Sequence, residues 1–175
     1  MNKWQKNTLL AVALVAGQIL LFNNLQLRGI LNSFVAPCIY IFYIFILPMG
    51  IAKVRLLLAS FMLGLAADIF SGTLGLNTAA CVLVGFIRPS VVKLFISRKD
   101  ISKDMCPSIY TLKFANFSCY VFILTFIFHL VLFFLEIFTF YEAYFTLLRA
   151  LLSSVAAVVI MIILEIFFEK KVKHY

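Results

Sequence analysis

The stretch FANFSCYVFILTFIFHLVLFFL, residues 114–135, contains no formally charged side chain. A transmembrane helix needs about 20 predominantly apolar residues to cross the hydrocarbon core of a bilayer. The stretch meets this length, and its one imidazole belongs to His129. It therefore predicts a membrane-spanning helix in a chain for which lipid is a large part of the solvent.

The rest of the chain is similarly apolar. Of its 175 residues 65% are hydrophobic and 13% are charged, whereas a soluble domain is about a quarter charged. Apolar runs separated by short breaks predict one all-α membrane domain over residues 1–175, with about six transmembrane helices. The predicted helices cover residues 8–27, 31–49, 55–70, 74–92, 114–135 and 147–168.

Two of these predicted helices contain prolines, which interrupt the hydrogen bonding of a helix. Pro37 and Pro48 lie in the helix predicted for 31–49, where neighbouring helices can supply partners for the freed carbonyl groups. Arg88 and Pro89 predict an end to the regular part of the fourth helix. Residues 90–96 then either extend that helix or lie along the membrane surface.

The basic residues indicate the orientation. If the N-terminus is cytoplasmic and the chain crosses six times, all of the 15 Lys and Arg residues except Arg28 and Arg149 fall on the cytoplasmic side. Such a bias is typical of membrane proteins and places both termini in the cytoplasm. The predicted cytoplasmic basic surface, facing anionic lipid or cytoplasmic partners, comprises Arg88, Lys93, Arg98, Lys99 and Lys103. Nucleic acid is not an expected partner, because no basic stripe with interleaved aromatic residues occurs.

Asp68 is the acidic residue that stands out, because it lies near the end of an apolar helix. Acids inside membrane segments often mark functional sites. Gly64 and Ser60 precede it on the same helix face, and this small-residue spacing favours close helix packing or partner binding. Alternatively, Asp68 stabilises the helical hairpin alone, by accepting hydrogen bonds from the backbone of residues 72–77.

The turn after Asp68 is predicted from its glycines. Gly72 and Gly75 permit a tight reversal, and Asn77 is expected to cap the next helix. For these three residues a structural role is the favoured interpretation.

Motifs for catalysis are missing from the sequence. It contains no HExxH, no GxSxG and no P-loop, so an enzyme is not expected. The four cysteines are dispersed, and neither a metal nor a cofactor is expected. His129 is interpreted as a hydrogen-bonded residue rather than a proton relay, and Glu165 as a residue at the inner interface.

One segment carries a family resemblance. The run GLAADIFSGTLGLN, residues 64–77, and the following FIRP, residues 86–89, resemble the rod shape-determining protein MreD family, in its Bacteroides-group form. The match at the level of motifs covers about residues 45–96, and the length and six predicted helices also fit. Many members carry a proline in the turn, whereas here Thr73 leads directly into Leu74.

The resemblance implies a non-enzymatic scaffold of the bacterial cell-elongation complex in the inner membrane. Its implied partners are an MreC-like single-span protein, MreB filaments and the peptidoglycan polymerase and transpeptidase. Partner helices would bind the small-residue faces, so Gly64→Leu should abolish association. The family is also similar in fold to the substrate-binding subunits of energy-coupling-factor transporters. The alternative is therefore a vitamin-type small-ligand binding subunit, although the single tryptophan, Trp4, lies on the cytoplasmic side.

Overall fold

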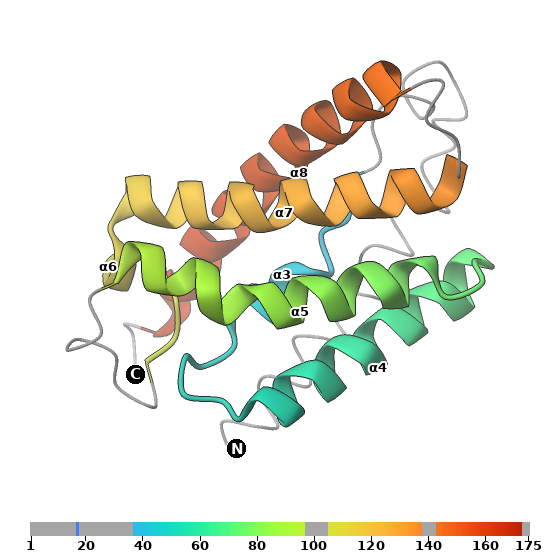
Figure 1. Cartoon of the computed structure of the whole chain (residues 1–175). Helices are drawn as coiled ribbons and strands as arrows, with labels where there is room; N and C mark the ends of the chain where they lie inside the picture. Colours follow the sequence, from blue (N-terminus) through green and yellow to red (C-terminus); the bar gives the residue numbers. More distant parts are fainter. Residues whose placement is uncertain (1–16, 18–36, 97–104, 138–142, 173–175) are drawn as a thin grey trace.

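A computed structural model describes residue 17 and residues 37–96, 105–137 and 143–172. Within these ranges the chain is helical and contains no strand, which confirms the all-α class there. The helices are α3 (Phe42–Ile46), α4 (Lys53–Ser71), α5 (Leu76–Phe95), α6 (Ile109–Leu112), α7 (Phe114–Ile137) and α8 (Ala143–Val172) (Figure 1). The helix predicted for 8–27, apart from residue 17, and residues Arg98, Lys99 and Lys103 lie outside the described ranges.

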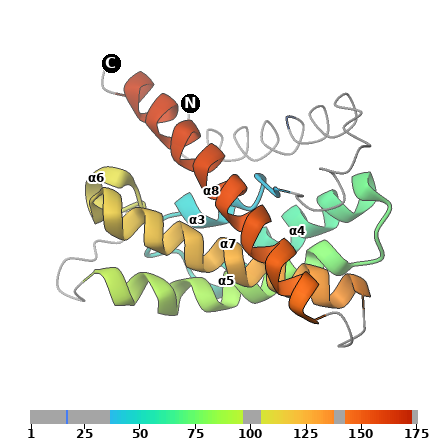
Figure 2. The ribbon, with the colours of Figure 1, turned by 90° about the horizontal axis from the view of Figure 1, so that it is seen from above.

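Four helices are long and apolar enough to cross a membrane: α4, α5, α7 and α8. They cover most of the ranges 55–70, 74–92, 114–135 and 147–168 in which the sequence predicts crossings. α5 packs between α4 and α7, and α8 packs on the opposite flank of α7. Figure 2 shows α8 crossing α7 obliquely. These helices make the protein membrane-embedded.

Of the two alternatives that the sequence left open for residues 90–96, the structure shows the extension of the fourth helix. α5 continues through Pro89 to Phe95, so residues 90–95 extend the helix rather than forming a separate surface segment. Pro89 removes one backbone hydrogen bond. Burial of Arg88, Val91 and Val92 on both sides of the proline holds the helix in place despite this loss.

The helix predicted for 31–49 is wrong in its described part. From residue 37 onward only Phe42–Ile46 is helical, and Leu47 is extended with φ −59° and ψ 148°. Pro48 explains the end of this short helix, because a residue before proline, here Leu47, is sterically driven out of the helical region. This segment is nevertheless buried along almost its whole length.

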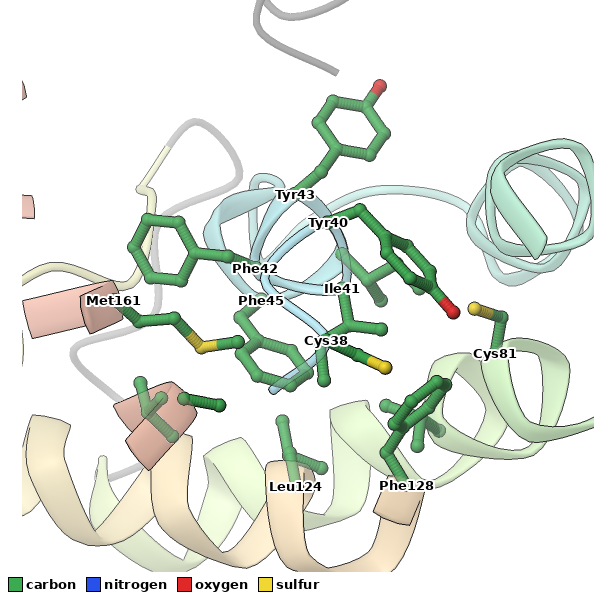
Figure 3. Close-up of a cluster of buried hydrophobic side chains, with 14 of the residues drawn as sticks. Cys38, Tyr40, Ile41, Phe42, Tyr43, Phe45, Cys81, Leu124, Phe128 and Met161 are labelled. Atoms are coloured by element: carbon green, nitrogen blue, oxygen red, sulfur yellow. The ribbon is translucent and has the colours of Figure 1, made fainter. Parts of the chain in front are cut away.

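The core is built around this buried segment. Its aromatic side chains Tyr40, Phe42 and Phe45 project among residues of α5, α7 and α8, whereas Tyr43 points away (Figure 3). Phe45 packs toward Leu124 of α7. The centre of the helical bundle is thus filled by non-regular chain and one short helix.

Candidate functional site

The α4–α5 connection is a tight turn that depends on two glycines. Gly72 has φ 67° and Gly75 has φ 82°, both in the left-handed region that favours glycine. The N–H groups of Gly72 and Thr73 both donate to the Asp68 carbonyl oxygen and close the end of α4. This is the reversal that the sequence predicted for Gly72 and Gly75.

The Asp68 carboxylate lies at the centre of this turn and is only 4% exposed. Its Oδ1 accepts hydrogen bonds from Thr73 Oγ1 at 2.5 Å and from the backbone N and side-chain Nδ2 of Asn77 at 3.0 Å each. Its Oδ2 accepts from the backbone N of Thr78 at 2.9 Å and from Thr78 Oγ1 at 2.5 Å. The side chain is therefore saturated by donors from its own hairpin, as the structural interpretation of Asp68 expects.

Asn77 does not cap α5, and this expectation was wrong. The N-cap position is Gly75, which offers no side chain. Asp68 instead reaches across the turn and binds the free N–H groups of Asn77 and Thr78 in the first turn of α5. A carboxylate is favourable there, because these N–H groups are otherwise unpaired and the helix dipole is positive at this end.

The side chain of Asn77 has a different function in the structure. Its Nδ2 donates to Thr73 Oγ1 at 3.0 Å as well as to Asp68, and its Oδ1 accepts from the Tyr40 hydroxyl at 2.7 Å. The turn is thereby connected to the buried segment that contains α3. Tyr40, Thr73 and Thr78 were not predicted, because only the folded chain brings these hydroxyl groups to Asp68 and Asn77.

Ser60 and Gly64 face α5 within the same chain. A Cβ atom on Gly64 would lie 2.5 Å from Thr78 Cα, so the two backbones touch at this point. Ser60, whose hydroxyl donates to Leu56 O at 2.9 Å, packs directly on Gly85. The helix-packing interpretation therefore describes these residues, whereas a partner helix cannot reach a face that α5 already covers.

Arg88 was predicted on a cytoplasmic basic surface, and this placement was wrong. Its side chain is 1% exposed. Nε donates to the Tyr120 hydroxyl at 3.1 Å, and Nη2 donates to the carbonyl oxygens of Phe45, at 3.1 Å, and Leu47. The carbonyl groups at the end of α3 lack helical partners, and they attract the guanidinium group into the core. Lys93, five residues further along α5, is exposed, and its place on a cytoplasmic surface stays a prediction.

Comparison of the chain with protein-family models, curated proteins and solved structures finds no match. The function therefore rests on the sequence and the geometry described above.

His129 is the third buried polar centre. Its Nδ1 lies 2.9 Å from Thr125 O, and its Nε2 lies 3.3 Å from the backbone N of Cys38. A neutral ring with its proton on Nδ1 satisfies both contacts, because it donates to the carbonyl group and accepts from the N–H group. This agrees with the interpretation of His129 as a hydrogen-bonded residue.

The described residues do not assemble a metal site, because no group of three or more His, Cys, Asp or Glu side chains converges there. Glu165 is buried near the end of α8. Asp68 stabilises the α4–α5 turn, Arg88 binds the carbonyl groups at the end of α3, and His129 binds the backbone of Cys38.

Proposed function

We propose that the protein is a non-enzymatic membrane scaffold of the bacterial cell-elongation complex, a member of the MreD type. The motif that resembles this family, residues 64–77, forms one closed unit in which both Asp68 oxygens bind internal donors. These internal hydrogen bonds of the Asp68 carboxylate carry the proposal. A carboxylate whose oxygens already bind donors of its own hairpin has a structural role, which fits a scaffold better than an enzyme or a ligand-binding protein.

The orientation belongs to the same proposal. The exposed cations Lys53, Lys93 and Lys113 lie at the start of α4, near the end of α5 and before α7, and therefore at one end of the four crossings. We assign this end to the cytoplasm and the 72–75 turn to the periplasm, because cytoplasmic loops carry the excess of Lys and Arg. The proposal is thus a bacterial inner-membrane protein with both termini in the cytoplasm, and its six crossings would count the chain around α3 as one crossing that is not a regular helix.

The partner surface must differ from the small-residue face of Ser60 and Gly64 that the sequence predicted, because α5 covers this face. We place it on the exposed side of the α4–α5 hairpin, in an open apolar groove of about 360 Å³ lined by Val54, Leu57, Leu58, Phe61 and Val82. A single apolar helix, such as that of an MreC-like protein, would pack there through van der Waals contacts alone.

The test is co-purification from native membranes in a mild detergent, followed by mass spectrometry. Recovery of an MreC-like single-span protein, together with MreB or peptidoglycan polymerase and transpeptidase, is the expected result. Phe61→Ala should reduce this recovery by removing apolar contact surface from the wall of the groove, whereas Val159→Ala, on the exposed side of α8, serves as the matched control.

The same experiment addresses the vitamin-type alternative. Recovery of paired ATPases with a coupling membrane subunit, and no elongation protein, would sink the scaffold proposal. The similarity in fold to transporter binding subunits would then become the guide, and the search would turn to a bound ligand.

A further inference from the structure

The interior segment, defined as residues 37–47, is an unusual element for a membrane protein. Only Phe42–Ile46 is helical in it, yet residues Cys38–Phe45 and Leu47 are buried. Irregular backbone at membrane depth persists only where protein or internal water satisfies its polar groups. The contacts that satisfy the interior segment therefore decide whether it stays in place.

One set of contacts lies at its C-terminal end. Arg88 donates to Phe45 O and Leu47 O, and the Tyr120 hydroxyl donates to Phe45 O at 3.0 Å. Tyr120 also accepts from Arg88 Nε, so both side chains act together. No carboxylate among the described residues bonds Arg88 in the structure, and the guanidinium group faces the partial negative charge of the carbonyl groups at the end of α3.

Another set lies at the N-terminal end. His129 accepts from the backbone N of Cys38, and Asn77 accepts from the Tyr40 hydroxyl. These bonds join neutral groups and are weaker than those of a guanidinium group, because charged hydrogen bonds are about twice as strong. Charged hydrogen bonds from Arg88 thus hold one end of the interior segment, and bonds to His129 and Asn77 hold the other.

We propose that the interior segment is a releasable element and that Arg88 holds it in the closed position. Tyr120 lies in the first half of α7 and His129 in the second half, so the segment extends along the bundle interior between two membrane depths. Loss of the Arg88 contacts removes the donor to the Leu47 carbonyl group and leaves the Phe45 carbonyl group with the Tyr120 hydroxyl, so that an apolar core then holds an unpaired carbonyl group, which favours exit of the segment. Its exit opens the centre of the bundle, where the Tyr40 hydroxyl points toward the buried Cys81 thiol (Figure 3).

The test is hydrogen–deuterium exchange on the full chain in detergent micelles, comparing the wild type with Arg88→Gln. Exchange over residues 42–47 should become about tenfold to a hundredfold faster in the variant, while exchange in the middle of α5 and α7 stays unchanged. Alkylation of Cys81 by N-ethylmaleimide, followed by peptide mass spectrometry, should rise in parallel. Cys106 is exposed and reports that the reagent is active.

Two further variants test whether Arg88 retains the interior segment specifically or stabilises the whole helical bundle. Arg88→Lys keeps the charge but cannot form the same fork of bonds, so its exchange should be intermediate. Lys93→Gln removes an exposed charge from the same helix and should behave as wild type. Wild-type exchange over 42–47 in Arg88→Gln would overturn the proposal. An equal rise across the segment, α5 and α7 would also overturn it, by showing that Arg88 supports the whole bundle.

Discussion

At the scale of single residues, Asp68 is the most connected side chain of the hairpin. Asp68→Ala should lower the free energy of unfolding by about 2 kcal/mol or more, because it removes a helix cap and leaves buried donors unpaired. Thermal or denaturant unfolding in detergent measures the loss. Glu136→Ala is the matched control, since this half-exposed carboxylate makes only a 3.4 Å surface pair with Arg149. Equal stability of the two variants would contradict the assigned role of Asp68.

Gly64 gives the second prediction at this scale. Gly64→Leu should prevent the hairpin from forming, because even a Cβ atom would collide with the Thr78 backbone. The expected measurement is loss of the monodisperse protein peak in size-exclusion chromatography, before any partner is added. Ala79→Leu adds the same side chain on the exposed side of α5 and should be tolerated. A stable Gly64→Leu variant would contradict the backbone contact between α4 and α5 at Gly64 and Thr78.

At the scale of elements, the α4–α5 turn is limited by backbone conformation rather than by space. A Cβ atom at Gly75 would meet nothing within 4 Å, yet its φ of 82° is strained for a side chain. Gly75→Ala should therefore cost about 1–2 kcal/mol, whereas Gly75→Asn should cost less, since asparagine tolerates this region. The melting temperatures of the two variants provide the comparison. A more stable alanine variant would contradict a left-handed Gly75.

At the scale of the whole molecule, the proposed orientation predicts opposite accessibility for two cysteines in intact cells. Leu74, in the turn, is 99% exposed, and the native Cys106 is exposed near the start of α6. Leu74→Cys should react with a membrane-impermeant maleimide applied to spheroplasts, while Cys106 reacts only after lysis. The reverse pattern would invert the topology and contradict the charge-based assignment.

The sequence by itself determined the parts that depend on local composition. Long apolar runs predict the helices at 114–135 and 147–168, of which only the first is free of formal charge, and the glycines at 72 and 75 predict the reversal after Asp68. These features follow from hydrophobic length and backbone sterics, which neighbouring residues specify.

Only the tertiary structure decided how the distant polar groups pair. Arg88 looks like a residue that ends a helix at the membrane surface, and its burial becomes apparent only when the carbonyl groups at the end of α3 are placed beside it. Pro48 indicates a break in the helix predicted for 31–49. The non-helical chain nevertheless stays inside the bundle, because Arg88, Tyr120 and His129 form hydrogen bonds with its backbone. Such partners lie far apart in sequence and meet only through packing, because a buried polar group requires a partner wherever the fold supplies one.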